Sequence, residues 1–244
     1  MGDILESPSA ERNKAPIWDM VLGRSIFPKL TANADAEKRV DLKVLELAAG
    51  CGVHTEHFVM SFNKSFKDFA IEWTPSDPDM EARLSIDARA KAAGLQRYIL
   101  PSNGWALGDA GGTACGDGNS RRRQNADVRG SETADFAQHL EKFDLITCIN
   151  MIHISPWSAT RGLMDCAGKC LRKGGMLVCY GPYKVGGTAT DSNMRFDQSL
   201  RSRDPSWGVR NIEDVCAVAD ENGLEFVEKI EMPANNLSVV FRKN

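Results

Sequence analysis

The chain has 244 residues, 42% of them hydrophobic, and a formal net charge of −3. This length fits a single α/β domain spanning residues 1–244 with a proper hydrophobic core. The small negative charge argues against a nucleic-acid-binding protein, and no stretch reaches the roughly 18 apolar residues of a membrane span. The first residues lack a signal-peptide core, so we expect a cytoplasmic location.

Helical and extended patterns alternate along the chain. Apolar residues at helical spacing predict helices over 10–24 (with Pro16 an interruption), 54–62, 80–94, 157–175 and 211–223. Short apolar runs bounded by turn residues predict strands over 43–48, 69–79, 97–100, 143–150, 176–180, 224–232 and 236–244. This order describes a doubly wound, Rossmann-like mixed sheet with an added antiparallel end.

Residues 104–135 fit none of these elements. The segment is rich in glycine and contains almost no bulky apolar side chains. A loop of this length is uncommon inside a compact domain, so we expect an inserted loop that is mobile or disordered.

The stretch LELAAGCGVH at 45–54 leads from the first strand to the next helix through Gly50 and Gly52. Glycines allow a sharp turn and a close backbone approach to a ligand. In an open parallel sheet, ligands lie beyond the carboxyl ends of the strands at this position. Asp77, at the end of the second strand, stands where a ribose hydroxyl pair needs an acceptor. The pattern predicts a nucleoside site.

Two nucleoside ligands compete for this arrangement. A dinucleotide normally requires a third glycine for its pyrophosphate, and Thr55 occupies that position. S-adenosylmethionine has no phosphate, and its cationic groups would give the inward-facing Glu46 a partner. A buried carboxylate otherwise costs several kcal/mol unless it is paired. An ion pair within the fold is the alternative explanation of Glu46.

Seven strings along nearly the whole chain resemble the DUF938 family, the methyltransferase-like 26 proteins. They are AERNKAPI (10–17), LELAAGCGVH (45–54), WTPSD (73–77), INMIHISPW (149–157), YGPYKVGG (180–187), SNMRFDQSLRSRDPSWGVR (192–210) and MPANNLSVVFRKN (232–244). The resemblance implies the class I S-adenosylmethionine-dependent methyltransferase fold, a seven-stranded sheet with its last strand antiparallel. It also implies that the chain binds S-adenosylmethionine, with S-adenosylhomocysteine as the product.

Carried over position by position, the resemblance implies cofactor contacts in four segments. These are Arg12 and Asn13 on a covering helix, Glu46, Gly50 and Gly52 at the methionine end, Asp77 at the ribose, and Asn150 and Met151 beside the sulfonium. Ala48 stands where many class I enzymes have another glycine. Where family members carry an acidic residue at the adenine edge, this chain has PSNGW, so Ser102 or Asn103 takes that place, and Asp109 is a further candidate.

His153, three residues after the fourth strand, is the candidate proton acceptor, because an imidazole titrates near neutral pH. A structural histidine is the alternative. Substrate contacts are expected where the fifth strand ends, at Tyr180 and Tyr183, with core packing as the alternative for Tyr180. Trp157, Phe196 and Trp207 are candidate walls of an aromatic or aliphatic pocket. The resemblance suggests a pocket role for Asn235 and Asn236, and a plain turn is the alternative. His54 and His57 lie one turn apart without a third ligand, so we expect no metal site.

Three functions stay open from the sequence alone. The first is a methyltransferase acting on a small molecule at an oxygen, nitrogen or sulfur atom. The second is a cyclase or isomerase of the same fold, in which the cofactor is an aid or is absent. The third is a non-enzymatic binding module. We expect a small-molecule partner and neither nucleic acid nor membrane, and the sequence leaves the oligomeric state open.

Overall fold

The computed structural model describes residues 3–32, 41–105, 107 and 139–244. The loop predicted over 104–135 therefore lies outside the described residues, except for Gly104, Trp105 and Leu107. Asp109 also lies outside them. The assignment of the whole chain to one domain stays a prediction.

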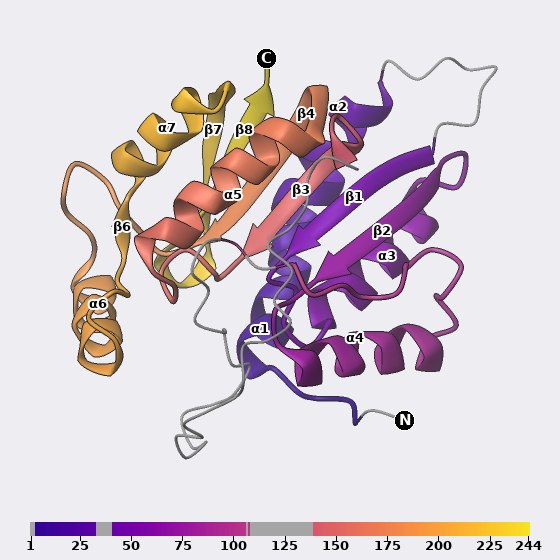
Figure 1. Cartoon of the computed structure of the whole chain (residues 1–244), viewed down its shortest axis with the longest axis horizontal. Coiled ribbons are helices and arrows are strands. Elements are labelled where there is room, and N and C mark those ends of the chain that lie inside the picture. The colour runs from indigo at the N-terminus through magenta and orange to yellow at the C-terminus, as the bar shows by residue number, and fades with distance from the viewer. Residues whose placement is uncertain (1–2, 33–40, 106, 108–138) are drawn as a thin grey trace.

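Six strands form a mixed sheet in the order β2-β1-β3-β4-β8-β7, with helices on both faces (Figure 1). They are β1 (Asp41–Leu47), β2 (Ala70–Ser76), β3 (Phe143–Ile149), β4 (Leu171–Gly181), β7 (Leu224–Met232) and β8 (Asn236–Lys243). The first four are mutually parallel, and β8 is antiparallel to both β4 and β7. The predicted doubly wound class and the antiparallel last strand are confirmed. Two short strands, β5 (Tyr183–Lys184) and β6 (Arg210–Asn211), form a separate parallel pair.

The helices begin with a continuous run of α1 (Pro8–Ile17), the π-helix η1 (Trp18–Ile26) and α2 (Phe27–Thr31). The others are α3 (Val53–Ser65), α4 (Met80–Ala92), α5 (Trp157–Cys170), α6 (Asp191–Arg203), α7 (Ile212–Glu221) and a 3-10 turn, η3 (Pro233–Asn235). None of the helices in the described ranges is both long enough and apolar enough to cross a bilayer.

Alternation along the strands divides the core into two layers. In β1, Leu42 and Val44 pack with α1, η1 and α3, whereas Leu45 and Leu47 pack with α5 and α7. Both faces of β1 are buried, because successive side chains of a strand point to opposite sides of the sheet. The sheet therefore has buried faces throughout its centre, and the carboxyl ends of its parallel strands come together at one edge.

The predicted seventh strand is only partly formed. Residues 97–100 lie beside β2, where Trp73 N donates to Tyr98 O at 2.7 Å and Leu100 N donates to Trp73 O at 2.9 Å. These contacts make isolated bridges rather than a continuous strand. Pro101 follows at once and has no N–H to donate to a ladder, which accounts for the break.

Two predicted helix boundaries were wrong. The helix predicted over 10–24 with an interruption at Pro16 instead begins at Pro8, continues through Pro16 into the π-helix η1 and ends with α2 at Thr31. A proline removes one backbone donor and often changes helix geometry rather than ending it. The helix predicted over 157–175 ends at Cys170, because Leu171 is already extended and pairs with Phe143.

Candidate functional site

The turn after β1 has an unusual backbone. Ala48, Gly50 and Gly52 have φ values of 54°, 57° and 85°, and Asn150 at the end of the adjacent β3 has 59°. The left-handed region costs an alanine about 1–2 kcal/mol, and such strain concentrates at functional sites. Gly52 is needed for packing as well, since a Cβ there would lie 3.0 Å from Ile86 Cα. Strained backbone thus gathers at the carboxyl ends of two neighbouring strands.

Hydrogen bonds from two other elements hold this turn. Asp77 Oδ2, after β2, accepts from Gly50 N at 2.8 Å. The carbonyl oxygen of Cys51 accepts from Ser85 Oγ at 3.0 Å and from Arg89 Nε at 3.1 Å, both on α4. The turn is therefore fixed before any ligand arrives.

Glu46 lies buried at the end of β1, directly before the turn. Its Oε2 accepts from Thr55 Oγ1 at 2.6 Å and from Trp73 Nε1 at 2.8 Å. Burial raises the pKa of Glu46 to about 7; the two hydrogen bonds oppose that rise, and the charge of Asp77 adds to it. Within the described ranges Glu46 has no salt bridge, so the alternative explanation by an ion pair is not supported.

Asp77 is also fully buried, and both of its oxygens hold backbone. Oδ1 accepts from Asp79 N at 2.9 Å, while Oδ2 holds Gly50. Burial raises the pKa of Asp77 to about 6 despite these bonds. Its observed task is to fix the glycine turn, and its contact to a ribose stays a prediction. Two buried carboxylates at neighbouring strand ends make this place favourable for a cation. We call Glu46, Gly50, Gly52 and Asp77 the glycine-turn site.

A polar cluster from four elements lies at the covering helix. Asn13 of α1 is buried and its Oδ1 lies 2.6 Å from His54 Nε2 on α3. The side chains of Asn13 and of Asn236 on β8 face the hydroxyl of Tyr180 at the end of β4 and oppose the rise in its pKa that burial causes. Burial lowers the pKa of His54 to about 3, so its ring is neutral and donates from Nε2. Arg12, predicted together with Asn13, is exposed.

Sequence reasoning named Tyr180 and Asn236 as candidates on the substrate side but did not bring them together with Asn13 and His54. Strand parity could have placed Tyr180 here, because Val178 two residues earlier packs on the α1 side of the sheet. His54 was considered as half of a metal pair with His57 and, in preference, as a cap at the start of a helix. No group of three or more potential metal ligands occurs in the described part of the chain.

The β3–α5 loop carries the next group of predicted residues. Asn150 N donates to Tyr180 O at 2.8 Å, and Met151 is buried beneath the loop. Ser155 Oγ donates to Met151 O at 3.0 Å, which closes the loop on itself. Asn150 and Met151 are thus fixed at the end of β3, next to the glycine turn in strand order, and their cofactor contacts stay predictions.

The ring of His153 is buried in close contact with Gly181 and Phe196. A Cβ on Gly181 would lie 3.0 Å from its Nδ1, and its ring lies 5.7 Å from that of Phe196. Burial, followed by the charges of Arg210 and Arg203, lowers the pKa of His153 to about 3. A proton acceptor works best with a pKa near the operating pH. These surroundings favour the alternative of a structural histidine.

The two residues predicted at the adenine edge differ in their surroundings. Ser102 is held on α4, since its Oγ donates to Arg83 O at 3.1 Å and its N donates to Asp87 Oδ1 at 3.0 Å. Asn103 lies beside the end of β2, and its carbonyl oxygen accepts a hydrogen bond from Asp77 N at 3.1 Å. Asn103 is therefore the one of the two that lies beside the glycine-turn site.

Three of the predicted substrate residues are aromatic rings near α6 and β6. Phe196 lies on His153, and the guanidinium of Arg210 lies 5.7 Å above the Trp157 ring. Arg203 lies 5.9 Å from the ring of Trp207. The structure therefore gathers these rings on one side of the β3–α5 loop, each against a histidine or an arginine.

Two further predicted substrate residues face elsewhere. Tyr183 packs in the core under α5 and α7, where burial raises the pKa of its hydroxyl. Asn235 is exposed and ties η3 to α6, because its Nδ2 donates to Ser192 Oγ at 3.0 Å and its carbonyl accepts from Asn193 Nδ2 at 2.8 Å. The neighbours Tyr180 and Asn236 take the inward positions instead.

The chain matches one protein family along almost its whole length. The model described as "Protein of unknown function (DUF938)" matches residues 5–105 and 110–243. The chain belongs to the DUF938 family. Membership agrees with the strings quoted above, which run through α1, the glycine turn, the β3–α5 loop and α6.

Solved structures share the fold at low sequence identity. An O-methyltransferase family 2 protein from Planctomyces limnophilus, in complex with apigenin, matches with a TM-score of 0.58 and 15% identity over 99% of this chain and 63% of its own. YcgJ from Bacillus subtilis matches with a TM-score of 0.56 and 16% identity over 91% of this chain and 99% of its own. PigF with S-adenosylhomocysteine matches with a TM-score of 0.56 and 10% identity over 97% and 67%. The DUF938 chain thus has the methyltransferase fold and spans about three-fifths of the first O-methyltransferases it matches.

Proposed function

We propose that this DUF938 protein is an S-adenosylmethionine-dependent methyltransferase with a small-molecule substrate. The observation that carries the proposal is Glu46, a buried carboxylate whose hydrogen-bond donors among the described residues are both neutral, Thr55 and Trp73. A carboxylate in that setting is stabilised by a cation beside it. PigF, which shares this fold, was solved with S-adenosylhomocysteine, and this supports a nucleoside of that kind as the ligand proposed here.

The residues at the strand ends fit such a ligand. Its ammonium group would lie near Glu46, and the glycine turn leaves backbone accessible where a side chain would intrude. Asn103 and Asn150 lie at the ends of neighbouring segments, with amides that can bond the adenine and the amino-acid portion. When bound, S-adenosylmethionine supplies an activated methyl carbon. The protein's part is to orient the acceptor and exclude water, effects worth up to roughly 7–11 kcal/mol in well-placed cases.

Proton transfer has a limited role in this proposal. His153 is neutral and its lowered pKa makes it a weak acceptor. A substrate whose nucleophile is already unprotonated, or loses its proton to water, needs no protein base. We therefore assign His153 to shaping the substrate side, where it supports Phe196.

Binding can be tested by calorimetric titration with S-adenosylmethionine and S-adenosylhomocysteine. We expect binding of both, with affinity for S-adenosylmethionine rising from about pH 6 to about pH 8 as Glu46 ionises. The variant Glu46→Gln keeps an acceptor for Thr55 and Trp73 but removes the charge. It should bind S-adenosylmethionine at least about tenfold more weakly, a difference of about 1.4 kcal/mol, with a flatter pH profile.

The matched control is Glu231→Gln, which removes an exposed carboxylate from β7 and should leave affinity unchanged. Absence of heat with both nucleosides in the wild-type protein would overturn the proposal and favour a binding module without this cofactor. Binding without transfer of a labelled methyl group to any acceptor would instead favour the cyclase or isomerase.

A further inference from the structure

A second site lies beside the β3–α5 loop, where Arg210 and Gly208 contact that loop. A pocket of about 420 Å³ is lined by residues of α5, β5, α6, β6 and α7: Trp157, Lys184, Arg201, Val209, Arg210, Asn211, Asp214 and Ala217. We call it the α6 pocket. Its volume lies within the range of small-molecule sites, about 300–1,000 Å³. All of its lining residues are described, and the glycine-turn site is formed by different residues.

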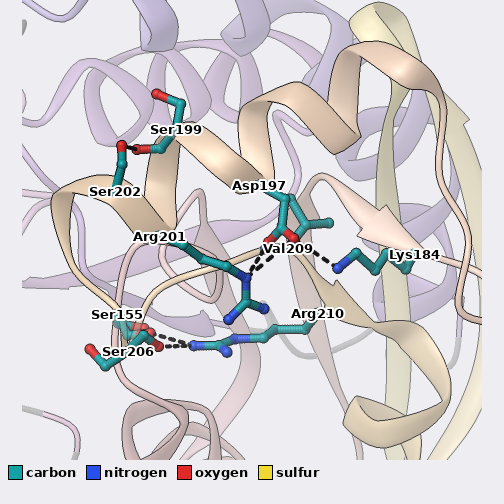
Figure 2. A network of polar contacts seen from close by, with 9 residues as sticks. All are labelled: Ser155, Lys184, Asp197, Ser199, Arg201, Ser202, Ser206, Val209 and Arg210. Atoms are coloured by element: carbon teal, nitrogen blue, oxygen red, sulfur yellow. Dashed lines mark hydrogen bonds and ion pairs between the residues drawn. The ribbon is translucent and has the colours of Figure 1, made fainter.

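Three cations belong to this lining, and one buried carboxylate positions two of them. Asp197 of α6 accepts from Lys184 Nζ at 2.9 Å, from Arg201 Nε at 3.2 Å and from Val209 N at 2.7 Å (Figure 2). Gly208 makes this possible, because a Cβ there would lie 2.7 Å from both Asp197 Oδ1 and Arg201 Nη2. Hydrogen bonds to Asp197 therefore fix the positions of Lys184 and Arg201.

Arg210 is the third cation and is fixed independently. Its Nη2 donates to Ser155 O at 2.8 Å and to Ser206 O at 2.6 Å (Figure 2). Its Nε is buried and finds no acceptor among the described residues. Burial, followed by the nearby charge of Arg201, lowers the pKa of Arg210, and the charge of Asp197 opposes this.

The charge count favours a monoanion. Three cations face two carboxylates, Asp214 in the lining and Asp197 behind it, which leaves one net positive charge. Asp197 occupies only part of the donor capacity of Lys184 and Arg201, since a lysine has three N–H donors and an arginine five. The flat indole of Trp157 forms another wall. A carboxylate on a flat, aromatic body matches this combination better than a phosphate dianion.

We propose that the α6 pocket binds the carboxylate of an aromatic acid. The pocket is built on the same loop that carries Asn150 and Met151, because Arg210 holds Ser155 O and Gly208 N donates to His153 O at 3.0 Å. If the function proposed above is right, this acid is the methyl acceptor, and that part rests on the proposed function. Binding of the carboxylate does not depend on it.

The test is calorimetric titration of the full chain with benzoate, with its neutral isostere benzamide and with inorganic phosphate. We expect saturable binding of benzoate, at least about tenfold tighter than benzamide and tighter than phosphate. Equal affinity for benzoate and benzamide, or no binding of benzoate, would overturn the proposal. Phosphate binding more tightly than benzoate would overturn the choice of a carboxylate. These arms need no variant.

Variants then locate the site. Arg201→Gln should weaken benzoate at least about tenfold, whereas Arg195→Gln, which removes an exposed arginine from the same helix, should not. Unchanged benzoate affinity in a folded Arg201→Gln protein would place the acid elsewhere and overturn the assignment. Arg201→Gln should keep its affinity for S-adenosylhomocysteine. If the wild-type protein binds benzoate but shows no binding of S-adenosylhomocysteine, the proposed methyl transfer is wrong and the proposal of a carboxylate-binding pocket is supported.

Discussion

The glycine-turn site and the network beside the α6 pocket each contain a buried carboxylate, and the pKa values of the two carboxylates are shifted in opposite directions. Glu46 receives only neutral donors, and burial raises its pKa to about 7. Asp197 is also subject to a rise from burial, but hydrogen bonds from Lys184, Val209 and Arg201 outweigh it and lower its pKa. In Figure 1, β1 and β2 lie at the right of the view and α6 with β6 at the left. Among the described residues, Glu46 therefore has no cation bonded to it, whereas the α6 pocket has three cations for two carboxylates.

The largest effect on the difference between the two sites is expected from Asp197→Asn. Removing the charge leaves Lys184 and Arg201 without their shared anion, and we expect unfolding free energy at pH 7 to fall by about 2 kcal/mol. This is less than for a fully buried pair, because the side chain of Arg201 is 47% exposed. Urea denaturation measures it, with the exposed Asp220→Asn as the control.

The pH dependence of that effect has a definite sign. The folded pKa of Asp197 lies below its ordinary value of 3.8, so its contribution is full above that pH and is lost as pH falls through the folded pKa. The gap between wild type and Asp197→Asn should therefore close in acid. A gap of the same size at low pH would mean that the loss comes from packing and not from charge.

Glu46→Gln should act in the opposite direction on the protein without ligand. The folded pKa of about 7 exceeds the ordinary 4.5, so wild-type stability falls as pH rises between those values and then stays level. At pH 8 we expect the variant to be more stable by roughly 1 kcal/mol, since a buried amide also loses hydration. Denaturation curves at about pH 5 and about pH 8 measure it. A variant less stable than wild type at both values would contradict our description of Glu46.

The smallest effect should come from Ala48→Gly. Ala48 has a φ of 54°, where glycine is unstrained, so relief of strain should outweigh the flexibility of the unfolded chain by about 0.5 kcal/mol. Ala49→Gly beside it is the control and should destabilise, because Ala49 is buried and outside the positive-φ positions. Equal losses in both variants would show that Ala48 is not strained.

Much of the first site could be predicted from sequence. The apolar runs of β1 and β3 and the glycines after β1 are local signals, and they placed Glu46, Gly50 and Asp77 at one edge of the sheet. The partners of Glu46 were not predictable in this way. Thr55 and Trp73 meet it only through the packing of α3 and β2, which no periodicity states.

The α6 pocket shows where sequence reasoning stopped. It depends on β5 and β6, which have two residues each and therefore no alternation to read. Tyr183 was predicted from its nearness to the end of a strand, and Asn235 from the family resemblance at a turn. The chain leaves the regular strand at Gly181 and turns through positive φ at Ala234, so facing cannot be extrapolated past those points.

The hydroxyl of Tyr180 faces the side chains of Asn13 and Asn236, which come from the first helix and the last strand. During synthesis on a ribosome, Asn13 emerges long before Asn236. The contacts of α1 with Tyr180 and Asn236 can therefore form only after the final hairpin of β7 and β8 has been made. The polar cluster beside the glycine turn is complete only when nearly all of the chain has been synthesised.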